Sequence, residues 1–286
     1  MSPDLIWKET PVSKWIDFVQ LAVSLSGERW HFRGVLEKWR LKTSIERAAE
    51  DWKIHPKKLP NLEKQLIFEF KRACHLSARM QLPNPDDTLG WLALMQHHGT
   101  PTRLLDLTYS PFVAAYFALD ALLSSPEPRP NAAVYALKIT PFERPEDALP
   151  TQELKVAYEQ YQQTRGGGPF RKIFLDANPP VTHAFLVNPY LLTERLAVQQ
   201  GLFVIPGNVA LPFEDNLSIM PDASNTQNLQ KFILQPSVLS DGLQGLRRMN
   251  IHSASLFPGL DGFARGLRHS CEFLISPQKF QGTGYY

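Results

Sequence analysis

Polar side chains that could do chemistry gather between two apolar stretches, residues 89–96 and 111–122. These polar residues are His97, His98, Thr102, Arg103, Asp106, Thr108 and Ser110. Gly99 and Pro101 end the first stretch, because glycine readily adopts the conformation that closes a helix and proline cannot continue one. Ser110-Pro111 supplies the N-cap and first-turn proline of a second helix. We therefore predict a site built on the connection between two helices.

The histidines and the serine of this connection have simpler explanations than a metal site or a nucleophile. Adjacent side chains such as His97 and His98 point in different directions, and no second cluster has the spacing of metal ligands, so we expect no metal. Ser110 fits an N-cap better than a nucleophile because the Gly-x-Ser-x-Gly pattern is absent. We expect His97 to line a pocket through a hydrogen bond.

Structural roles stay open for the charged residues. Arg103 and Asp106 lie three residues apart on a tight turn, where they could bond each other or cap a helix. Arg33 could contact a ligand or could be a buried arginine paired with Asp106. Gln199-Gln200-Gly201 could be a turn into a strand.

Hydrophobic periodicity predicts the elements that position these residues. Helices are expected over residues 13–25, 62–80, 89–98, 111–122, 152–163, 237–248 and 259–268. Strands are expected over residues 29–35, 132–139, 184–187, 201–205 and 232–234. Residues 42–52 form a short helix or loop, residues 191–197 a connector, and the glycine run at 166–168 a solvated loop. In the helix over residues 62–80, Leu66, Phe70, Ala73 and Leu76 are expected to point inward, with Cys74 in the core.

The order of these elements predicts an α+β fold. We expect a single domain with an N-terminal helical layer and a mixed, mainly antiparallel sheet, with the strands mainly in the second half of the chain. Residues 1–27 form an N-terminal helical segment, residues 28–270 the main domain, and residues 271–286 a C-terminal tail.

Composition excludes several classes of protein. The 286 residues are 43% hydrophobic, enough for a sizeable core, and the net charge of +2 is too small to indicate nucleic acid or a membrane surface. Two cysteines cannot form a disulfide framework, and no apolar run is long enough to span a bilayer. We expect a cytoplasmic protein.

Several motifs together resemble the FRG domain family, which is named for its Phe-Arg-Gly tripeptide. The matching residues are Trp30, Phe32-Arg33-Gly34, Gln96-His97-His98-Gly99, Pro101 to Asp106, Thr108, Ser110-Pro111 and Ala114 to Ala118. Later matches are Arg195, Gln199-Gln200-Gly201, Phe203, Leu256-Phe257-Pro258 and Leu260-Asp261-Gly262. The resemblance identifies the main domain, residues 28–270, as an FRG domain and implies a bacterial protein.

A second resemblance is to mono-ADP-ribosyltransferases of the arginine-serine-glutamate kind. In that family an aromatic-Arg-Gly strand holds NAD, a Ser/Thr-x-Ser strand end precedes a helix, and a glutamate lies just before a late strand. Phe32-Arg33-Gly34 is similar to the first element, and Thr108-Tyr109-Ser110 to the second. The third element falls in residues 194–203, which contain Glu194 but are centred on Arg195 and the glutamines. The resemblance implies an ADP-ribosyltransferase-like core.

The same resemblance implies NAD as the cofactor and gives the candidate residues their roles. A carboxylate would stabilise the oxocarbenium-like cation that develops when the nicotinamide–ribose bond breaks, and an arginine would bind phosphate or ribose. The catalytic candidates are Glu194 and Gln199, and the cofactor-binding candidates are Arg33, Gly34, His97, Arg103, Asp106, Thr108 and Ser110. Tyr116 or Phe203 would supply an aromatic ring near nicotinamide.

Two functions follow from these resemblances. One is an NAD-dependent, ADP-ribosyltransferase-like toxin or antiphage effector with an antitoxin or defence-system partner. The other is a non-catalytic module that senses a nucleotide or related ligand. A carboxylate of residues 194–200 facing Arg33 would favour the enzyme, and glutamines there would favour the binder. Nucleic acid is disfavoured as a partner, because the basic pairs Lys57-Lys58 and Arg247-Arg248 are isolated. Either function predicts one cavity lined by Arg33, Gln96, His97, Arg103, Asp106, Ser110 and Gln199.

Overall fold

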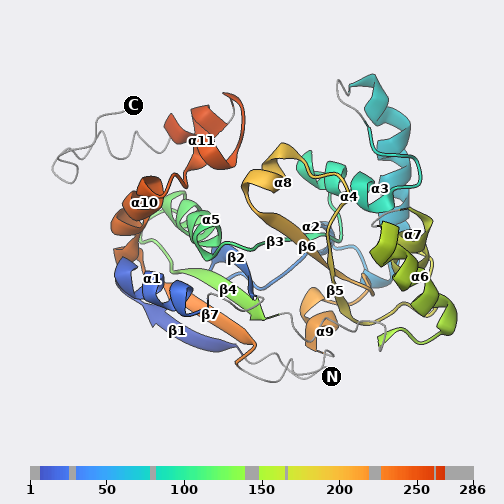
Figure 1. Cartoon of the computed structure of the whole chain (residues 1–286), viewed down its shortest axis with the longest axis horizontal. Helices are drawn as coiled ribbons and strands as arrows, with labels where there is room; N and C mark the ends of the chain where they lie inside the picture. Colours follow the sequence, from blue (N-terminus) through green and yellow to red (C-terminus); the bar gives the residue numbers. More distant parts are fainter. Residues whose placement is uncertain are drawn as a thin grey trace.

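The computed structural model describes residues 7–25, 30–77, 82–138, 148–164, 167–218, 227–260 and 262–267. A seven-stranded sheet, in the order β1-β7-β4-β2-β3-β6-β5, runs through this part of the chain (Figure 1). Its strands are β1 (Lys8–Val12), β2 (Trp30–Leu36), β3 (Leu105–Thr108), β4 (Ala132–Lys138), β5 (Ala184–Val187), β6 (Gly201–Pro206) and β7 (Leu229–Leu234). Only β1 and β7 pair in parallel among these strands, so the predicted α+β class with a mixed, mainly antiparallel sheet is confirmed.

Helices flank the sheet and correspond closely to the predicted periodic segments. They are α1 (Trp15–Ser24), α2 (Ser44–Asp51), α3 (Leu59–Ala73), α4 (Thr88–His97), α5 (Pro111–Leu123), α6 (Gln152–Thr164), α7 (Gly168–Phe174), α8 (Glu194–Val198), α9 (Phe213–Ser218), α10 (Leu239–Arg248) and α11 (Ser253–Leu256). Residues 262–267 are also helical, within the predicted helix 259–268. The predicted end of the first helix, Gly27, lies outside the described residues. α8 lies in the predicted connector, and the helices α7, α9 and α11 and the strand β3 were not predicted.

The strands are spread along the chain, so the expectation that they fall mainly in the second half is wrong. β1, β2, β3 and β4 all precede residue 139. β1 was not predicted because its sequence, KETPV, is short, charged and contains proline. Those are features of an edge strand, and pairing with β7, with Thr10 opposite Phe232, stabilises it.

The sheet is joined at a single position between β2 and β3. β2 pairs with β4 along its whole length, and β3 pairs with β6 from Leu105 to Thr108. The register between β2 and β3 contains one pair, Phe32 opposite Thr108. Beyond that pair the two strand edges separate, and their backbone groups need other partners because unpaired polar groups are costly when buried. The candidate site lies at this junction.

One face of the sheet around β2 and β4 is covered by α5, with α1 and α10 packed beside it (Figure 1). The small residues Ala114, Ala115 and Ala118 of α5 are fully buried and allow close approach. Gly34 of β2 lies against them: a Cβ built on it would come within 1.8 Å of the Ala114 carbonyl oxygen. The glycine of the Phe-Arg-Gly tripeptide therefore permits contact between the strand and α5.

A second core lies between α4, α6, α7 and strands β5 and β6. Aromatic rings dominate it: Phe170 and Phe174 lie 4.5 Å apart between centroids, and Phe174 lies 5.0 Å from Phe185. Gly168, part of the predicted loop, is the first residue of α7, because Gly167 with φ of 79° turns the chain into the helix. Gly166 lies outside the described residues.

The inward face predicted for α3 is partly wrong. The buried residues are Leu59, Glu63 and Ile67, whereas Leu66 and Phe70 are only partly buried. Ala73 is exposed and Leu76 is 79% exposed, because the α-helix ends at Ala73 and a short 3-10 helix follows. Cys74 is half-buried rather than in the core.

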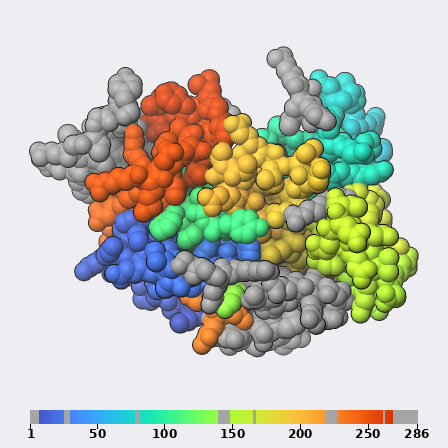
Figure 2. Space-filling model, in the orientation of Figure 1, coloured from blue at the N-terminus to red at the C-terminus, as the bar shows by residue number. Residues whose placement is uncertain are grey.

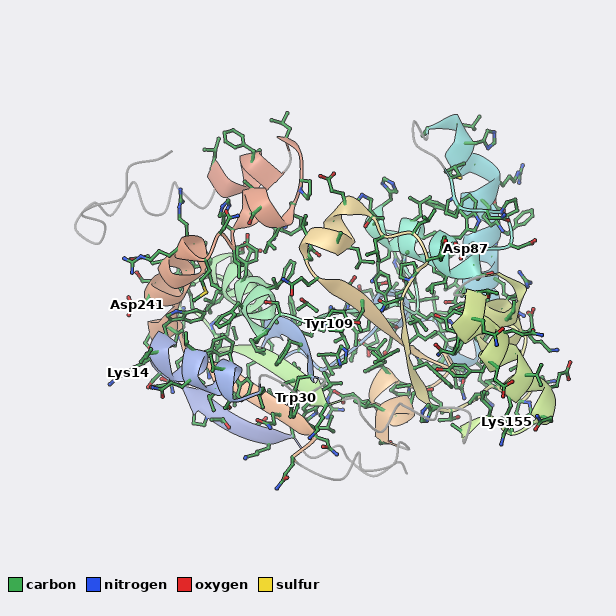
Figure 3. The ribbon with its side chains drawn as sticks, in the orientation of Figure 1. Lys14, Trp30, Asp87, Tyr109, Lys155 and Asp241 are labelled. Atoms are coloured by element: carbon green, nitrogen blue, oxygen red, sulfur yellow. The ribbon has the colours of Figure 1, made fainter. Side chains whose placement is uncertain are left out.

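The helix boundaries next to the site follow local capping rules. Asp87 accepts a hydrogen bond from the Gly90 N–H and caps α4, whose start is visible in Figure 3. Gly99 has φ of 82° after the end of that helix, as predicted. Ser110 accepts a hydrogen bond from the Val113 N–H and Pro111 opens α5, which confirms that cap. In the described part of the chain, no helix combines the length and apolar character needed to cross a membrane.

Candidate functional site

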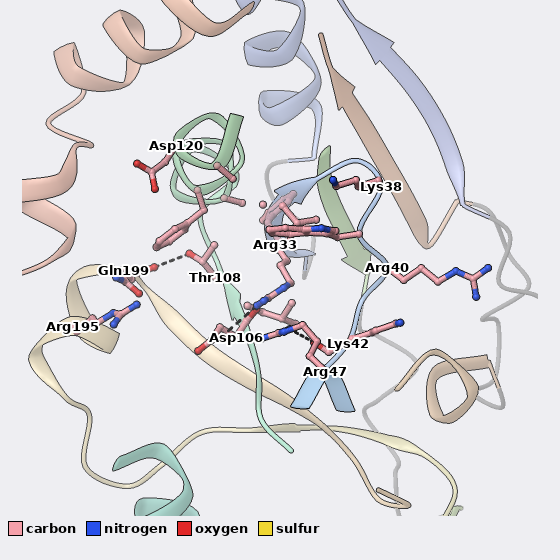
Figure 4. Close-up of a pocket in the computed structure, with 18 of the residues that line it drawn as sticks. Arg33, Lys38, Arg40, Lys42, Arg47, Asp106, Thr108, Asp120, Arg195 and Gln199 are labelled. Carbon is pink, nitrogen blue, oxygen red and sulfur yellow. Dashed lines mark hydrogen bonds and ion pairs between the residues drawn. The ribbon is translucent and has the colours of Figure 1, made fainter. Parts of the chain in front are cut away.

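A cleft of about 920 Å³ opens where β2 and β3 separate (Figure 4). Its walls come from β2, the following loop, α2, β3, α5 and α8, together with one residue of the C-terminal helix. The basic residues that line it are Arg33, Lys38, Arg40, Lys42, Arg47, Arg195 and Arg265. The acidic residues that line it are Glu50, Asp51, Asp106 and Asp120. Positive charge is therefore in excess in the cleft.

Arg33 bridges the two separating strands. Its Nη1 donates a hydrogen bond to the Asp106 carbonyl oxygen at 2.6 Å and lies 3.6 Å from the Asp106 carboxylate. The side chain is 18% exposed. Burial lowers the pKa of Arg33 and Asp106 opposes that effect, but an arginine remains charged at neutral pH. Arg33 therefore has both of the positions that the sequence left open, because it pairs with Asp106 and also lines the cleft.

The loop that follows α4 is held by a hydrogen-bond network around Gln96. The Gln96 amide nitrogen donates to the Asp106 carboxylate at 3.0 Å and to the Leu104 carbonyl at 3.2 Å. Its amide oxygen accepts from the hydroxyls of Ser44 and Thr102. The network fixes Asp106, whose side chain is 56% exposed, at the cleft and ties α2 to β3.

Thr108 connects β3 to the turn before β6. Its hydroxyl donates to the Gln199 carbonyl at 2.7 Å and accepts from the Ser110 N–H at 3.0 Å. The Gln199 amide nitrogen donates to the Leu256 carbonyl at 2.9 Å, so this residue also anchors the C-terminal segment. Figure 2 shows the gold segment around α8 beside that orange-red segment. Thr108 and Gln199 both line the cleft.

Two arginines at the far wall of the cleft share one aromatic ring. The guanidinium carbons of Arg195 and Arg265 lie 4.8 Å and 4.6 Å from the centroid of the Phe257 ring. Arg265 also forms an ion pair with Asp120 of α5. Nothing in the sequence distinguishes Arg47 and Arg265 from other arginines, because only the fold brings them to the cleft.

A smaller pocket of about 290 Å³ adjoins the cleft. Its lining includes His97, Gln96 and Phe203, and it shares Arg47, Asp106, Arg195 and Gln199 with the cleft. Partial burial, His98 and Arg195 all lower the pKa of His97. Phe203 is 4% exposed and is one of the two aromatic rings proposed from the sequence.

The other predicted site residues lie elsewhere. Arg103 does not bond Asp106, because its guanidinium forms a buried ion pair with Glu63. Ser110 caps α5 and lines neither cavity. Glu194 is exposed at the start of α8 and is likewise absent from both linings. Tyr116 is buried, with its hydroxyl 2.6 Å from the Ser253 hydroxyl.

The expected single cavity is therefore two adjoining cavities. The cleft contains Arg33, Gly34, Asp106, Thr108 and Gln199, and the smaller pocket adds Gln96 and His97. Within the described residues, no cluster of three or more His, Cys, Asp or Glu side chains could hold a metal ion.

The fold and the cleft define an α+β protein with a basic cleft at the junction of a mixed sheet. Residues 28–126 match the family model of the FRG domain, so the chain contains an FRG domain. The match includes β2, β3 and α5, and strands β4 to β7 of the same sheet follow it. No curated protein and no solved structure is significantly similar to the chain, and the ADP-ribosyltransferase-like core is not confirmed.

The helix that carries Arg47 contains a carboxyl group whose ionisation couples folding to pH. The Glu46 carboxylate accepts hydrogen bonds from the N–H groups of Thr43 and Phe213, and burial raises the pKa of Glu46 to about 7. In the unfolded chain the same group loses its proton near its ordinary value of 4.5. The folded protein therefore binds more protons between these two values, so this group makes stability fall as pH rises from about 4.5 to about 7.

Glu46→Gln is expected to flatten that decline and to stabilise the protein above pH 7, because glutamine keeps the capping oxygen without the charge. Urea unfolding midpoints measured from about pH 5 to about pH 8 test this. Glu159→Gln, at an exposed position of α6, is the control. Equal pH slopes in Glu46→Gln and the native protein would contradict the prediction.

Proposed function

We propose that the cleft binds a phosphate-bearing nucleotide of the dinucleotide class, with NAD as the first ligand to test. The observation that carries the proposal is the convergence of basic side chains from separate segments on one cleft, in excess over the carboxylates. Guanidinium groups match phosphate oxygens in geometry and charge. Trp39 and Phe117 also line the cleft and offer aromatic surfaces for a base or nicotinamide ring.

Arg33 is the central residue of this proposal. The contacts described for its guanidinium involve Nη1, and the group carries five N–H donors in all. Its position between β2 and β3 is fixed by the Asp106 carbonyl, so it is preorganised to bind an anion. Lys42 and Arg47 lie on the same side of the cleft (Figure 4).

Binding is better supported than catalysis. Gln199 precedes β6 at the cleft, whereas Glu194 is exposed and lines neither cavity. A neutral amide cannot stabilise developing positive charge as a carboxylate does. Asp106, exposed beside Arg33, favours NAD cleavage as a second candidate function, because bound NAD would supply a labile nicotinamide–ribose bond near that carboxylate. A role as toxin or antiphage effector, and any antitoxin partner, stay predictions that depend on such turnover.

In the test, NAD is titrated into the purified protein, and binding is monitored by calorimetry and by thermal unfolding. Released nicotinamide is assayed in the same samples. We expect NAD to raise the unfolding temperature through binding to the folded state. Arg33→Gln is expected to weaken NAD binding by about 10- to 100-fold, because that factor corresponds to the free energy of a hydrogen bond to a charged group. Nicotinamide release that Asp106→Asn abolishes would establish the enzyme.

Two controls make the result specific. Arg248→Gln removes an exposed arginine of α10 that lines neither cavity, and it should leave NAD binding unchanged. Arg33→Lys keeps the charge but loses the planar fork, so partial binding is expected. If neither NAD nor ADP-ribose binds the native protein, or if Arg33→Gln binds NAD normally, the proposed function is wrong.

A further inference from the structure

We infer that the cleft and the smaller pocket form one bipartite site, in which the linking phosphates of a dinucleotide bind between Arg47 and Arg195 and its two nucleoside groups occupy one chamber each. The inference rests on the proposed function, since it assumes that phosphate binds in the cleft. It adds how the ligand is divided between the two cavities and which residues hold its centre.

The shared wall is the first observation. Arg47, Asp106, Arg195 and Gln199 line both cavities, so any ligand that occupies both must pass these residues. Arg47 comes from α2 and Arg195 from α8, and in Figure 4 they face the Asp106 region from opposite sides. A diphosphate linker places charged oxygens on both sides of its axis, which two opposed guanidinium groups can bind.

The charge balance at this wall is the second observation. Asp106 is the one carboxylate that the two described linings share, and it also pairs with Arg33. Burial lowers the pKa of Arg33 and of Arg195 and the nearby Asp106 carboxylate opposes that effect, while Arg47 lowers the pKa of Arg33 further, so these groups interact electrostatically. Arg33, Arg47 and Arg195 together carry more positive charge than the Asp106 carboxylate neutralises. The net positive charge suits a linker with two negative charges better than a neutral ligand.

The sizes and linings of the chambers are the third observation. The smaller pocket, about 290 Å³, is near the lower limit of typical ligand sites, which span about 300–1,000 Å³. It offers the apolar surfaces of Ala93, Leu196 and Phe203 together with the polar side chains of Gln96 and Thr100. This combination fits one ring with its ribose. The cleft, about 920 Å³, has room for the second nucleoside group beside Trp39 and Phe117.

The test compares ADP-ribose, NAD and AMP by calorimetry on the native protein and on variants that crowd the smaller pocket. We expect NAD and ADP-ribose to bind at least about tenfold more tightly than AMP, because they reach the shared wall and both chambers. Thr100→Trp should remove most of this advantage, because the indole would fill the smaller pocket. His97→Trp crowds the same pocket from an exposed position, so it gives a second test if Thr100→Trp does not fold.

A further variant tests the shared wall itself. Arg47→Gln should weaken ADP-ribose at least about tenfold, whereas Arg248→Gln should not change its affinity. If AMP and ADP-ribose bind equally well and the crowding variants bind both normally, the bipartite site is wrong while the proposed nucleotide site stands. If no nucleotide binds the native protein, the proposed function fails as well.

Discussion

Glu63→Ala is expected to lower the free energy of unfolding by about 3–5 kcal/mol, because it leaves a buried arginine without its charge partner. The Glu63 and Arg103 side chains are 0% and 2% exposed. Arg103 Nε lies 2.9 Å from each Glu63 carboxylate oxygen, and Nη1 donates to the Pro206 carbonyl at 3.2 Å. The pair therefore connects α3 to the end of β6, and its loss would uncouple the helix from the sheet.

Urea unfolding followed by circular dichroism measures this effect. Glu69→Ala is the matched control, because Glu69 forms an exposed pair with Arg72 on the same helix and should change stability by less than about 1 kcal/mol. The double variant Glu63→Leu with Arg103→Met should recover much of the loss, since apolar residues can replace a buried pair. A loss in Glu63→Ala no larger than that in Glu69→Ala would contradict this account.

The sequence predicted the local structure around the site well. Periodicity located most helices, and the cap at Ser110 and the turn at Gly99 depend on residues that are neighbours in the chain. The Phe-Arg-Gly tripeptide placed Arg33 in a strand that lines the cleft, although Arg33 lies in the middle of β2 and not at the strand end that the sequence suggested. These features need no information about distant partners, so a single sequence is sufficient for them.

The sequence could not predict features that depend on partners far apart in the chain. Arg103 pairs with Glu63, 40 residues earlier, rather than with its neighbour Asp106. Arg265 reaches the cleft only because the C-terminal segment packs against α5 and α8. The separation of β2 and β3 after a single residue pair creates the cleft, and no periodic pattern marks it.

Gly34→Ala is expected to destabilise the protein by about 3 kcal/mol, the upper end of the usual cost of overpacking. The added Cβ would lie 1.8 Å from the Ala114 carbonyl oxygen and 2.7 Å from the Ala118 nitrogen, and both are backbone atoms that cannot rotate away. Relief of the clash requires β2 and α5 to separate. Both elements line the cleft, so the movement should also displace Arg33 and weaken ligand binding.

Gly168→Ala is the matched control for the effect of adding one methyl group. Apart from its two chain neighbours, no atom lies within 4 Å of a Cβ built at Gly168, and this residue begins α7, where alanine is the better helix former. We expect Gly168→Ala to be neutral or slightly stabilising in urea unfolding. If Gly34→Ala were as stable as Gly168→Ala, the tripeptide glycine would not be needed for packing. Close ligand approach to the backbone would then be the better explanation of the glycine, because Gly34 also lines the cleft.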